Sequence, residues 1–120
     1  GNVPFADVPY ALAASDVLAI PYRRSPFMDA GASNKIAEAM VCQRPIVATR
    51  SPNLTANFPQ QAQELDPYLA EPSQPSSLAT ALAQQLLDRC LISPPAGMYW
   101  DEIAKHIEQK CKQNLCSGKP

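Results

Sequence analysis

The chain has 120 residues, of which 46% are hydrophobic and 18% are charged, and its formal net charge at pH 7 is −1. Such a length and composition are typical of one globular domain, and the nearly balanced charge gives no electrostatic footprint for nucleic acid or an anionic membrane. No run reaches the roughly 20 apolar residues of a membrane-spanning helix, and the opening stretch GNVPFADVPY lacks the features of a signal peptide.

The first half of the chain alternates segments typical of helices and strands. Residues 6–16 (ADVPYALAASD) predict a short helix with proline in its first turn. Residues 17–21 (VLAIP) predict a buried strand closed by proline. The polar segment 22–33 predicts a loop, residues 34–41 predict a helix, and residues 45–49 (PIVAT) predict a second strand.

The second half is less regular at its start. Residues 50–67 contain three prolines and predict a loop with at most one helical turn. Residues 68–71 (YLAE) predict a third short strand. Residues 76–90 predict an amphipathic helix with leucine at every fourth position, capped by one of the serines at its start. Residues 99–115 predict a last helix, whose apolar stripe is formed by Trp100, Ile103, Ile107 and Cys111.

The alternation of strands and helices predicts an α/β fold with a parallel sheet. About three strands are expected, whereas sheets usually have about 4–6. We therefore expect residues 1–116 to form a partial Rossmann-like domain, one half of a larger doubly wound unit, followed by a tail at 117–120. Open edges of such a sheet make association with another chain plausible.

The four cysteines give no sign of a metal site. None forms a C-x2-C pair, and the H-x4-C-x4-C spacing of His106, Cys111 and Cys116 does not match structural zinc sites. We expect no bound metal, reduced thiols and a cytoplasmic location. His106 is expected to have a structural role.

Candidate binding residues lie where ligands enter doubly wound sheets, at the carboxyl ends of the strands. The helix starting near Asn34 turns its N-terminus to this edge, where free N–H groups favour an anion. Ser33, Asn34 and Lys35 add a hydroxyl, an amide and a cation, so a phosphate or diphosphate is the expected ligand. Glu38, one turn further, could accept hydrogen bonds from two vicinal hydroxyls of a ribose.

An alternative interpretation stays open on residue chemistry alone. Asn34 could be only a helix cap, and Lys35 with Glu38 only a solvated surface pair. Weaker candidates share this edge. They are three arginines that could meet phosphate and two aromatic residues that could line a pocket, Arg23, Arg24, Arg50, Tyr22 and Phe27.

Four passages, collinear over about residues 1–115, resemble glycosyltransferases of the two-domain GT-B fold, close to glycosyltransferase family 4. They are GNVPFADVPYALAASDVLAIPY, SNKIAEAMVCQRPIVAT, YLAEPSQPSSLATALAQQLLDR and MYWDEIAKHIEQ. The resemblance implies the second half of the C-terminal, donor-binding domain. It also implies a UDP- or GDP-sugar donor as substrate, no cofactor or metal, and retaining transfer of the sugar to an acceptor hydroxyl.

The same resemblance implies roles for particular residues. Glu38 would bind the ribose hydroxyls. Ser33, Asn34 and Lys35 would flank the diphosphate, and Gly31 in the preceding loop is also counted among the donor-binding residues. Residues 1–4 would lie near the base. The first glutamate of the family's E-x7-E motif is replaced by Ala30, which makes the adjacent Asp29 a candidate sugar-side contact. The glycine that ends the family's helix is replaced by Gln43-Arg44.

The catalytic residues of the reaction are not located in this stretch. We expect the full enzyme to bind a glycan, lipid or other hydroxyl acceptor through an N-terminal domain absent from this sequence, and the chain alone to be inactive. Membrane association of the longer enzyme is left open. Two alternatives remain: a non-catalytic nucleotide- or phosphate-binding remnant, and part of a nucleotide-sugar 2-epimerase.

Overall fold

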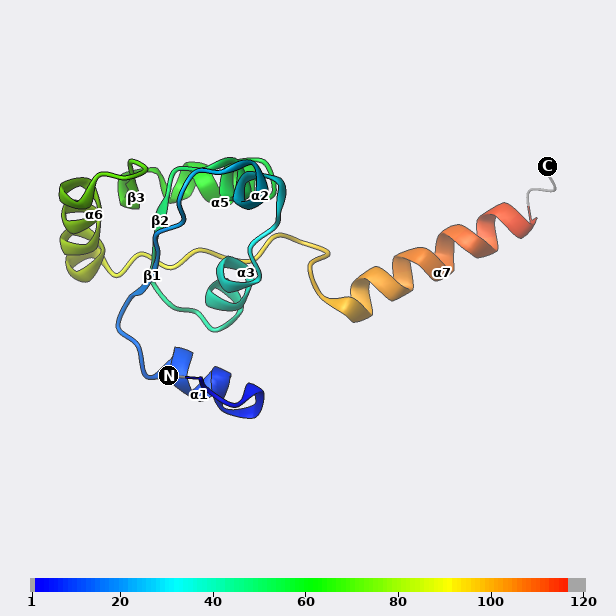
Figure 1. Ribbon diagram of the computed structural model, residues 1–120. Coiled ribbons are helices and arrows are strands. Elements are labelled where there is room, and N and C mark those ends of the chain that lie inside the picture. Colours follow the sequence, from blue (N-terminus) through cyan, green and yellow to red (C-terminus); the bar gives the residue numbers. More distant parts are fainter. Residues whose placement is uncertain (1, 117–120) are drawn as a thin grey trace.

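The computed structural model describes residues 2–116, so Gly1 and the expected tail at 117–120 lie outside the described residues (Figure 1). Its centre is a three-stranded parallel sheet in the order β1-β2-β3, formed by Leu18–Ile20, Ile46–Thr49 and Leu69–Ala70. Ala19 pairs with Val47, and Ala48 pairs with Leu69. The expected α/β fold with about three parallel strands is confirmed.

Helices surround this sheet on both sides (Figure 1). In chain order they are the 3-10 turn η1 (Phe5–Asp7), α1 (Val8–Ala13), α2 (Pro26–Ala30), α3 (Asn34–Val41), α4 (Pro52–Thr55), α5 (Pro59–Glu64), the 3-10 turn η2 (Asp66–Tyr68), α6 (Pro75–Asp88) and α7 (Trp100–Cys116). Helix α3 contacts β1 and β2, whereas α6 contacts β2 and β3. Because α3 connects the end of β1 to the start of the parallel strand β2, its N-terminus lies toward the edge of the sheet where the strands end.

Two segments that were expected to be loops contain helices. The loop expected at residues 22–33 includes α2, and the loop expected at 50–67 includes α4, α5 and η2. Each of these three α-helices has proline at its first position, where the missing N–H has no intrahelical partner to lose. Ser25 caps α2 by accepting the Met28 N–H at 3.1 Å. The prolines therefore start helices here and do not mark irregular chain.

Helix α6 differs in two details from the expectation. Its N-cap is Gln74 and not a serine, while Ser77 Oγ accepts the Glu71 N–H at 2.9 Å, outside the helix. Its buried face is formed by Ala81 and Gln85, and Leu86 is nearly half exposed. The leucine periodicity locates the helix but not the residues that face the sheet.

The core lies around β2, all four residues of which are buried. A strand buried on both faces is typical of a parallel sheet covered by helices. Side chains from α3, α4 and the α5–η2 junction complete the core, among them Ile36, Met40, Leu54 and Leu65. This packing fixes α3 against the sheet.

Helix α3 ends in a Schellman motif built without glycine. Gln43 has a φ of 52°, the left-handed conformation, and its N–H binds the Met40 carbonyl at 3.1 Å. The Arg44 N–H binds the Ala39 carbonyl at 3.0 Å. The conformation expected for the family's glycine is therefore present although the glycine is not.

Replacing Gln43 by glycine is expected to raise the free energy of unfolding by about 1 kcal/mol, because a left-handed φ is strained for a residue with a Cβ. Urea unfolding followed by circular dichroism measures this change. Gln63→Gly is the matched control, since Gln63 is an exposed residue inside α5 and the same substitution there should lower stability by about 1 kcal/mol. A loss of stability in Gln43→Gly would contradict the prediction.

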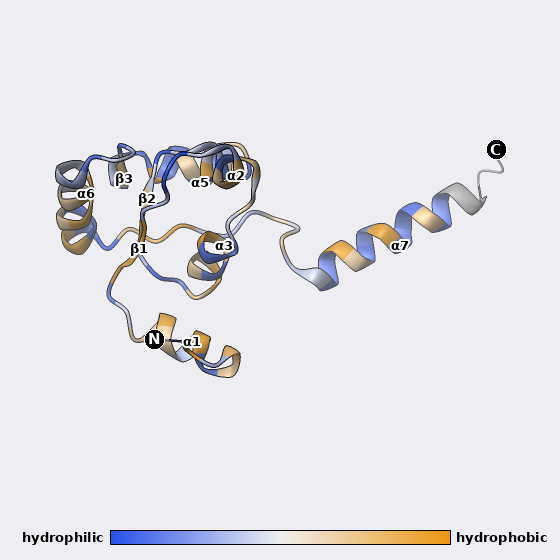
Figure 2. Cartoon of the chain, in the orientation of Figure 1, coloured by the Kyte–Doolittle hydropathy of each residue, from blue (hydrophilic) through white to orange (hydrophobic). Residues whose placement is uncertain are grey.

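Helix α7 extends away from the body, so the chain measures 59 × 30 × 28 Å (Figure 1). Its amphipathic pattern is visible in Figure 2, but its apolar stripe is not buried, and Trp100 is 84% exposed. His106 is also exposed, and the structural role expected for it has no packing to support it. Among the described residues, no helix combines the length and hydrophobicity needed to cross a membrane.

Candidate functional site

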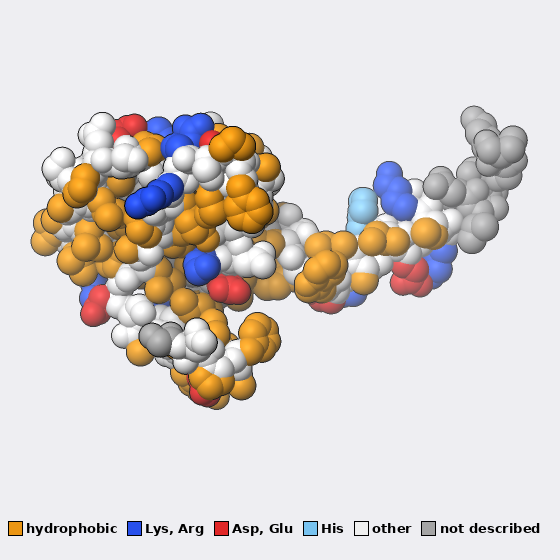
Figure 3. All heavy atoms as spheres, viewed as in Figure 1, with side chains coloured by type: hydrophobic (Ala, Val, Ile, Leu, Met, Phe, Trp, Pro, Cys, Tyr) orange, Lys and Arg blue, Asp and Glu red, His pale blue; other side chains and the backbone are white. Residues whose placement is uncertain are grey.

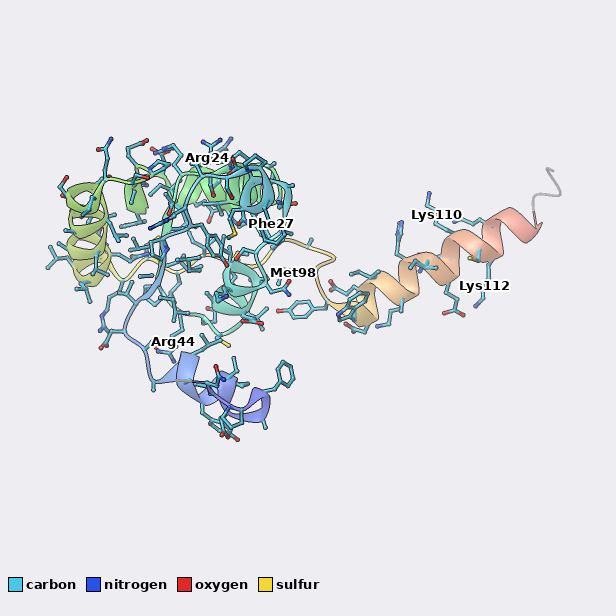
Figure 4. The ribbon with its side chains drawn as sticks, viewed as in Figure 1. Arg24, Phe27, Arg44, Met98, Lys110 and Lys112 are labelled. Carbon is cyan, nitrogen blue, oxygen red and sulfur yellow. The ribbon has the colours of Figure 1, made fainter. Side chains whose placement is uncertain are left out.

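A cavity of about 240 Å³ lies at the N-terminus of α3, and we call it the helix-start cavity. It is lined by Tyr22, Phe27, Met28, Gly31, Ala32, Ser33, Asn34, Lys35 and Asn53. The structure therefore brings together four of the candidate donor-binding residues, along with the two aromatic residues that were weaker candidates. Phe27, which is labelled in Figure 4, belongs to α2.

Ser33 shapes the start of α3. The residue is buried, and its Oγ accepts the Ile36 N–H at 3.3 Å as the N-cap. The same oxygen hydrogen-bonds to the Tyr22 hydroxyl at 3.1 Å. The cap is thus Ser33 and not Asn34, and the amides of Asn34 and Lys35 remain as donors because the first N–H groups of a helix have no intrahelical acceptor.

Asparagines of the α4 region hold the other wall of the cavity. Asn53 Nδ2 donates to the Met28 carbonyl at 3.1 Å, and Asn57 Nδ2 donates to the Gly31 carbonyl at 3.3 Å. Asn53 is 4% exposed, and its Oδ1 has no hydrogen-bond partner among the described residues. A buried acceptor without a donor is costly, so a donor group supplied by a ligand or water would satisfy it.

Sequence reasoning missed Asn53 because residues 50–67 were expected to be a loop. The available signal was the Ser51-Pro52 pair, which is typical of a helix start and directs attention to the side chains of the first turn.

Glu38 lies outside the helix-start cavity. It is exposed and lines a second cavity of about 430 Å³ between α1, α3 and the start of α7, which we call the apolar groove. The groove is lined by Phe5, Val8, Pro9, Leu12, Ala37, Glu38, Val41, Cys42, Met98, Tyr99 and Trp100, among which Glu38 is the one charged residue. Met98 lies beside α3 in Figure 4. Glu38 is thus separated from the other candidates by one helical turn.

Lys35 and Glu38 do not pair with each other, but both lie on the exposed face that the surface alternative expects. The ion pairs among the described residues do not include this pair, and both side chains are exposed. Both residues therefore have charges available to a ligand.

Asp29 is held by a neighbouring arginine. Arg24 Nε lies 3.0 Å from both carboxylate oxygens of Asp29, at the edge where Arg24 is labelled in Figure 4. Asp29 is not among the residues that line the helix-start cavity. The structure thus gives this candidate sugar contact an intramolecular partner and no place in the cavity wall.

A third cavity, of about 460 Å³, lies at the carboxyl ends of the three strands, and we call it the strand-end cleft. It is lined by Pro21, Tyr22, Arg23, Arg24, Thr49, Ala70, Glu71, Ser73, Gln74, Pro75 and Leu78. Figure 3 shows basic and acidic side chains together along this upper edge of the body. Tyr22 lines both this cleft and the helix-start cavity, so the two cavities are neighbours.

The arginines of this edge differ in their partners. Arg50 binds Asp66 Oδ1 at 2.7 Å and Glu71 Oε1 at 3.2 Å, and the hydrogen bond to Asp66 is the main cause that raises the pKa of Arg50. Arg24 binds Asp29, whereas Arg23 has no ion-pair partner among the described residues. No three potential metal ligands gather in the part of the chain that the structure describes.

The fold is a partial Rossmann-like α/β unit, and basic side chains and free helix amides lie at the carboxyl edge of its sheet. The sequence matches the family described as glycosyl transferases group 1 over residues 1–88. The chain therefore belongs to this family, as the first three of the four passages indicated, and glycosyl transfer is the role that membership supports. The match contains the whole sheet and the helix-start cavity, but it ends before α7.

Comparison with curated proteins and with solved structures gives no match.

Proposed function

We propose that the chain is the nucleotide-sugar-binding part of a glycosyltransferase that moves a sugar from a UDP- or GDP-type donor to an acceptor hydroxyl. The observation that carries the proposal is that α3 joins two cavities, with free amides at one and the Glu38 carboxylate at the other. Asn34 and Glu38 are four residues apart and share a helix face, with a rise of about 6 Å between them. A diphosphate and its ribose can span such a distance.

In this arrangement the diphosphate lies against the amides of Asn34 and Lys35. The positive end of the helix and the Lys35 ammonium favour the anion. They also stabilise the charge that develops on the diphosphate as it leaves the sugar, which is an electrostatic contribution to catalysis. The buried Oδ1 of Asn53 is available to accept a hydrogen bond from a sugar hydroxyl in the same cavity.

The nucleoside lies in the apolar groove. The Glu38 carboxylate at its wall accepts hydrogen bonds from the two ribose hydroxyls, and the aromatic residues Phe5, Tyr99 and Trp100 offer faces on which a base can stack. We also propose that the sugar is transferred with retention of its configuration, because the chain resembles glycosyltransferase family 4.

Binding of UDP or GDP is expected to quench the fluorescence of Trp100, the single tryptophan of the chain, because the base stacks beside its exposed ring. A titration of the purified chain with each nucleotide measures the dissociation constant. UMP is the control for the second phosphate and should bind more weakly, while inorganic pyrophosphate should leave the fluorescence unchanged. If neither UDP nor GDP at millimolar concentration changes the fluorescence of Trp100, the proposal is contradicted.

A second candidate is a nucleotide-binding module without catalysis. It is favoured by Ala30 in place of the family's glutamate and by the ion pair that occupies Asp29. We expect the chain by itself to bind the donor without turning it over. Release of free sugar from a UDP- or GDP-sugar by the purified chain would overturn this expectation.

A further inference from the structure

We propose that the strand-end cleft binds an oxyanion, a phosphate ester or a carboxylate, carried by the acceptor. The identification of its carrier as the acceptor rests on the proposed function, whereas the anion site itself does not. The cleft is the largest of the three cavities described above, and its volume lies within the range of small-molecule sites.

The charges around the cleft favour an anion. Arg23 has no ion-pair partner among the described residues, and Arg24 uses only its Nε on Asp29. The remaining guanidinium nitrogens of both residues are donors. The carboxylate in the lining, that of Glu71, is bound by Arg50. Guanidinium groups recognise phosphate and carboxylate through paired N–H donors.

Neutral donors surround the same cleft. Its lining includes Ser73 and Gln74, whose hydroxyl and side-chain amide are donors. Tyr22 also lines the cleft, but its hydroxyl hydrogen-bonds to Ser33. Gln74 is the N-cap of α6 without a side-chain cap bond, so the amides of the first turn of this 14-residue helix are not satisfied by a capping side chain. An oxyanion would find both charged and neutral donors here.

The position of the cleft suits an acceptor. Tyr22 separates it from the helix-start cavity and hydrogen-bonds to Ser33 at the α3 N-cap. An acceptor whose anionic group sits in the cleft would therefore have its remaining groups next to the proposed donor. The arginines would also offset the repulsion between the two anions.

The test is an NMR titration of the ¹⁵N-labelled chain with methyl phosphate and, separately, with acetate, in the absence and presence of UDP. Either anion should shift the amides of Arg23, Arg24, Ser73 and Gln74. The anion that binds more tightly shows whether the cleft prefers a phosphate ester or a carboxylate. UDP alone should shift the amides of Asn34, Lys35 and Glu38.

Arg23→Gln should weaken anion binding about tenfold, because it removes a charge-assisted contact. Arg89→Gln is the control, since Arg89 pairs with Asp16 and is not part of the cleft lining. Cleft shifts that persist when UDP fails to bind would support the anion site and remove only the donor proposal. Shifts confined to Asn34 and Lys35, or equal affinities in the two variants, would overturn the anion site.

Discussion

Replacing Gln85 by leucine is expected to lower the free energy of unfolding by about 2–4 kcal/mol, a large part of the stability of a small domain. Gln85 is fully buried on α6. Its Nε2 donates to the carbonyls of Ile46 at 2.9 Å and Cys90 at 3.2 Å, and its Oε1 accepts the Cys90 N–H at 2.9 Å. One side chain thus joins the end of α6 to the start of β2.

The loss is expected because leucine fills a similar volume but leaves three backbone groups without their partner. The Ile46 carbonyl lies in the buried core, where an unpaired acceptor costs about 1–3 kcal/mol. Urea unfolding measures the change. Gln63→Leu, at an exposed position of α5, is the control and should change stability by less than about 0.5 kcal/mol. Equal stability of the two variants would mean that Gln85 does not hold this junction.

Replacing Glu38 by alanine is expected to weaken UDP binding by about tenfold or more, because two hydrogen bonds from ribose hydroxyls to a carboxylate are lost. Folding should be unaffected, since Glu38 is exposed and its side chain makes no hydrogen bond or ion pair within the described residues, and alanine is a good helix former. The substitution therefore separates binding from stability.

Trp100 fluorescence measures the affinity of the variant for UDP, and thermal unfolding checks its stability. Glu64→Ala is the matched control, because Glu64 is an exposed glutamate at the end of α5 that lines none of the cavities. It should bind UDP like the original chain. If Glu38→Ala does the same, Glu38 has no part in the nucleotide site.

The sequence was sufficient for the elements whose local pattern agrees with their packing. Helix α3 begins and ends where it was expected, and the three strands lie within one or two residues of their predicted bounds. Strand β2 is a short apolar run, and burial on both faces is what such a run favours. In these elements hydrophobicity and backbone propensity favour the same structure.

Prediction failed where proline was read as a breaker. Pro26, Pro52 and Pro59 each begin a short helix, and their serine or aromatic predecessors are the N-caps. The difference decides the site, because α4 carries Asn53 into the helix-start cavity. A buried asparagine with an unpaired oxygen depends on tertiary packing, which a local pattern does not contain.

The residues of the candidate site were predicted from the sequence, but their division between two separate cavities was not. The helical pattern placed Asn34 and Glu38 on one face, yet it gave no sign that α1 and the start of α7 build a separate groove around Glu38. The groove brings α3 against α1 and against Met98, Tyr99 and Trp100, which lie more than 50 positions further along the chain. The strand-end cleft likewise combines side chains that lie at the ends of, or just after, three different strands.

Helix α7 has a consequence for how the molecule scatters X-rays. The radius of gyration is 17.4 Å, whereas a compact chain of this length would have about 14 Å. Each atom contributes to this quantity by the square of its distance from the centre of mass, so one helix roughly 26 Å long dominates the excess. Small-angle scattering would therefore distinguish the extended form from one with α7 folded onto the body, although their circular dichroism spectra would be the same.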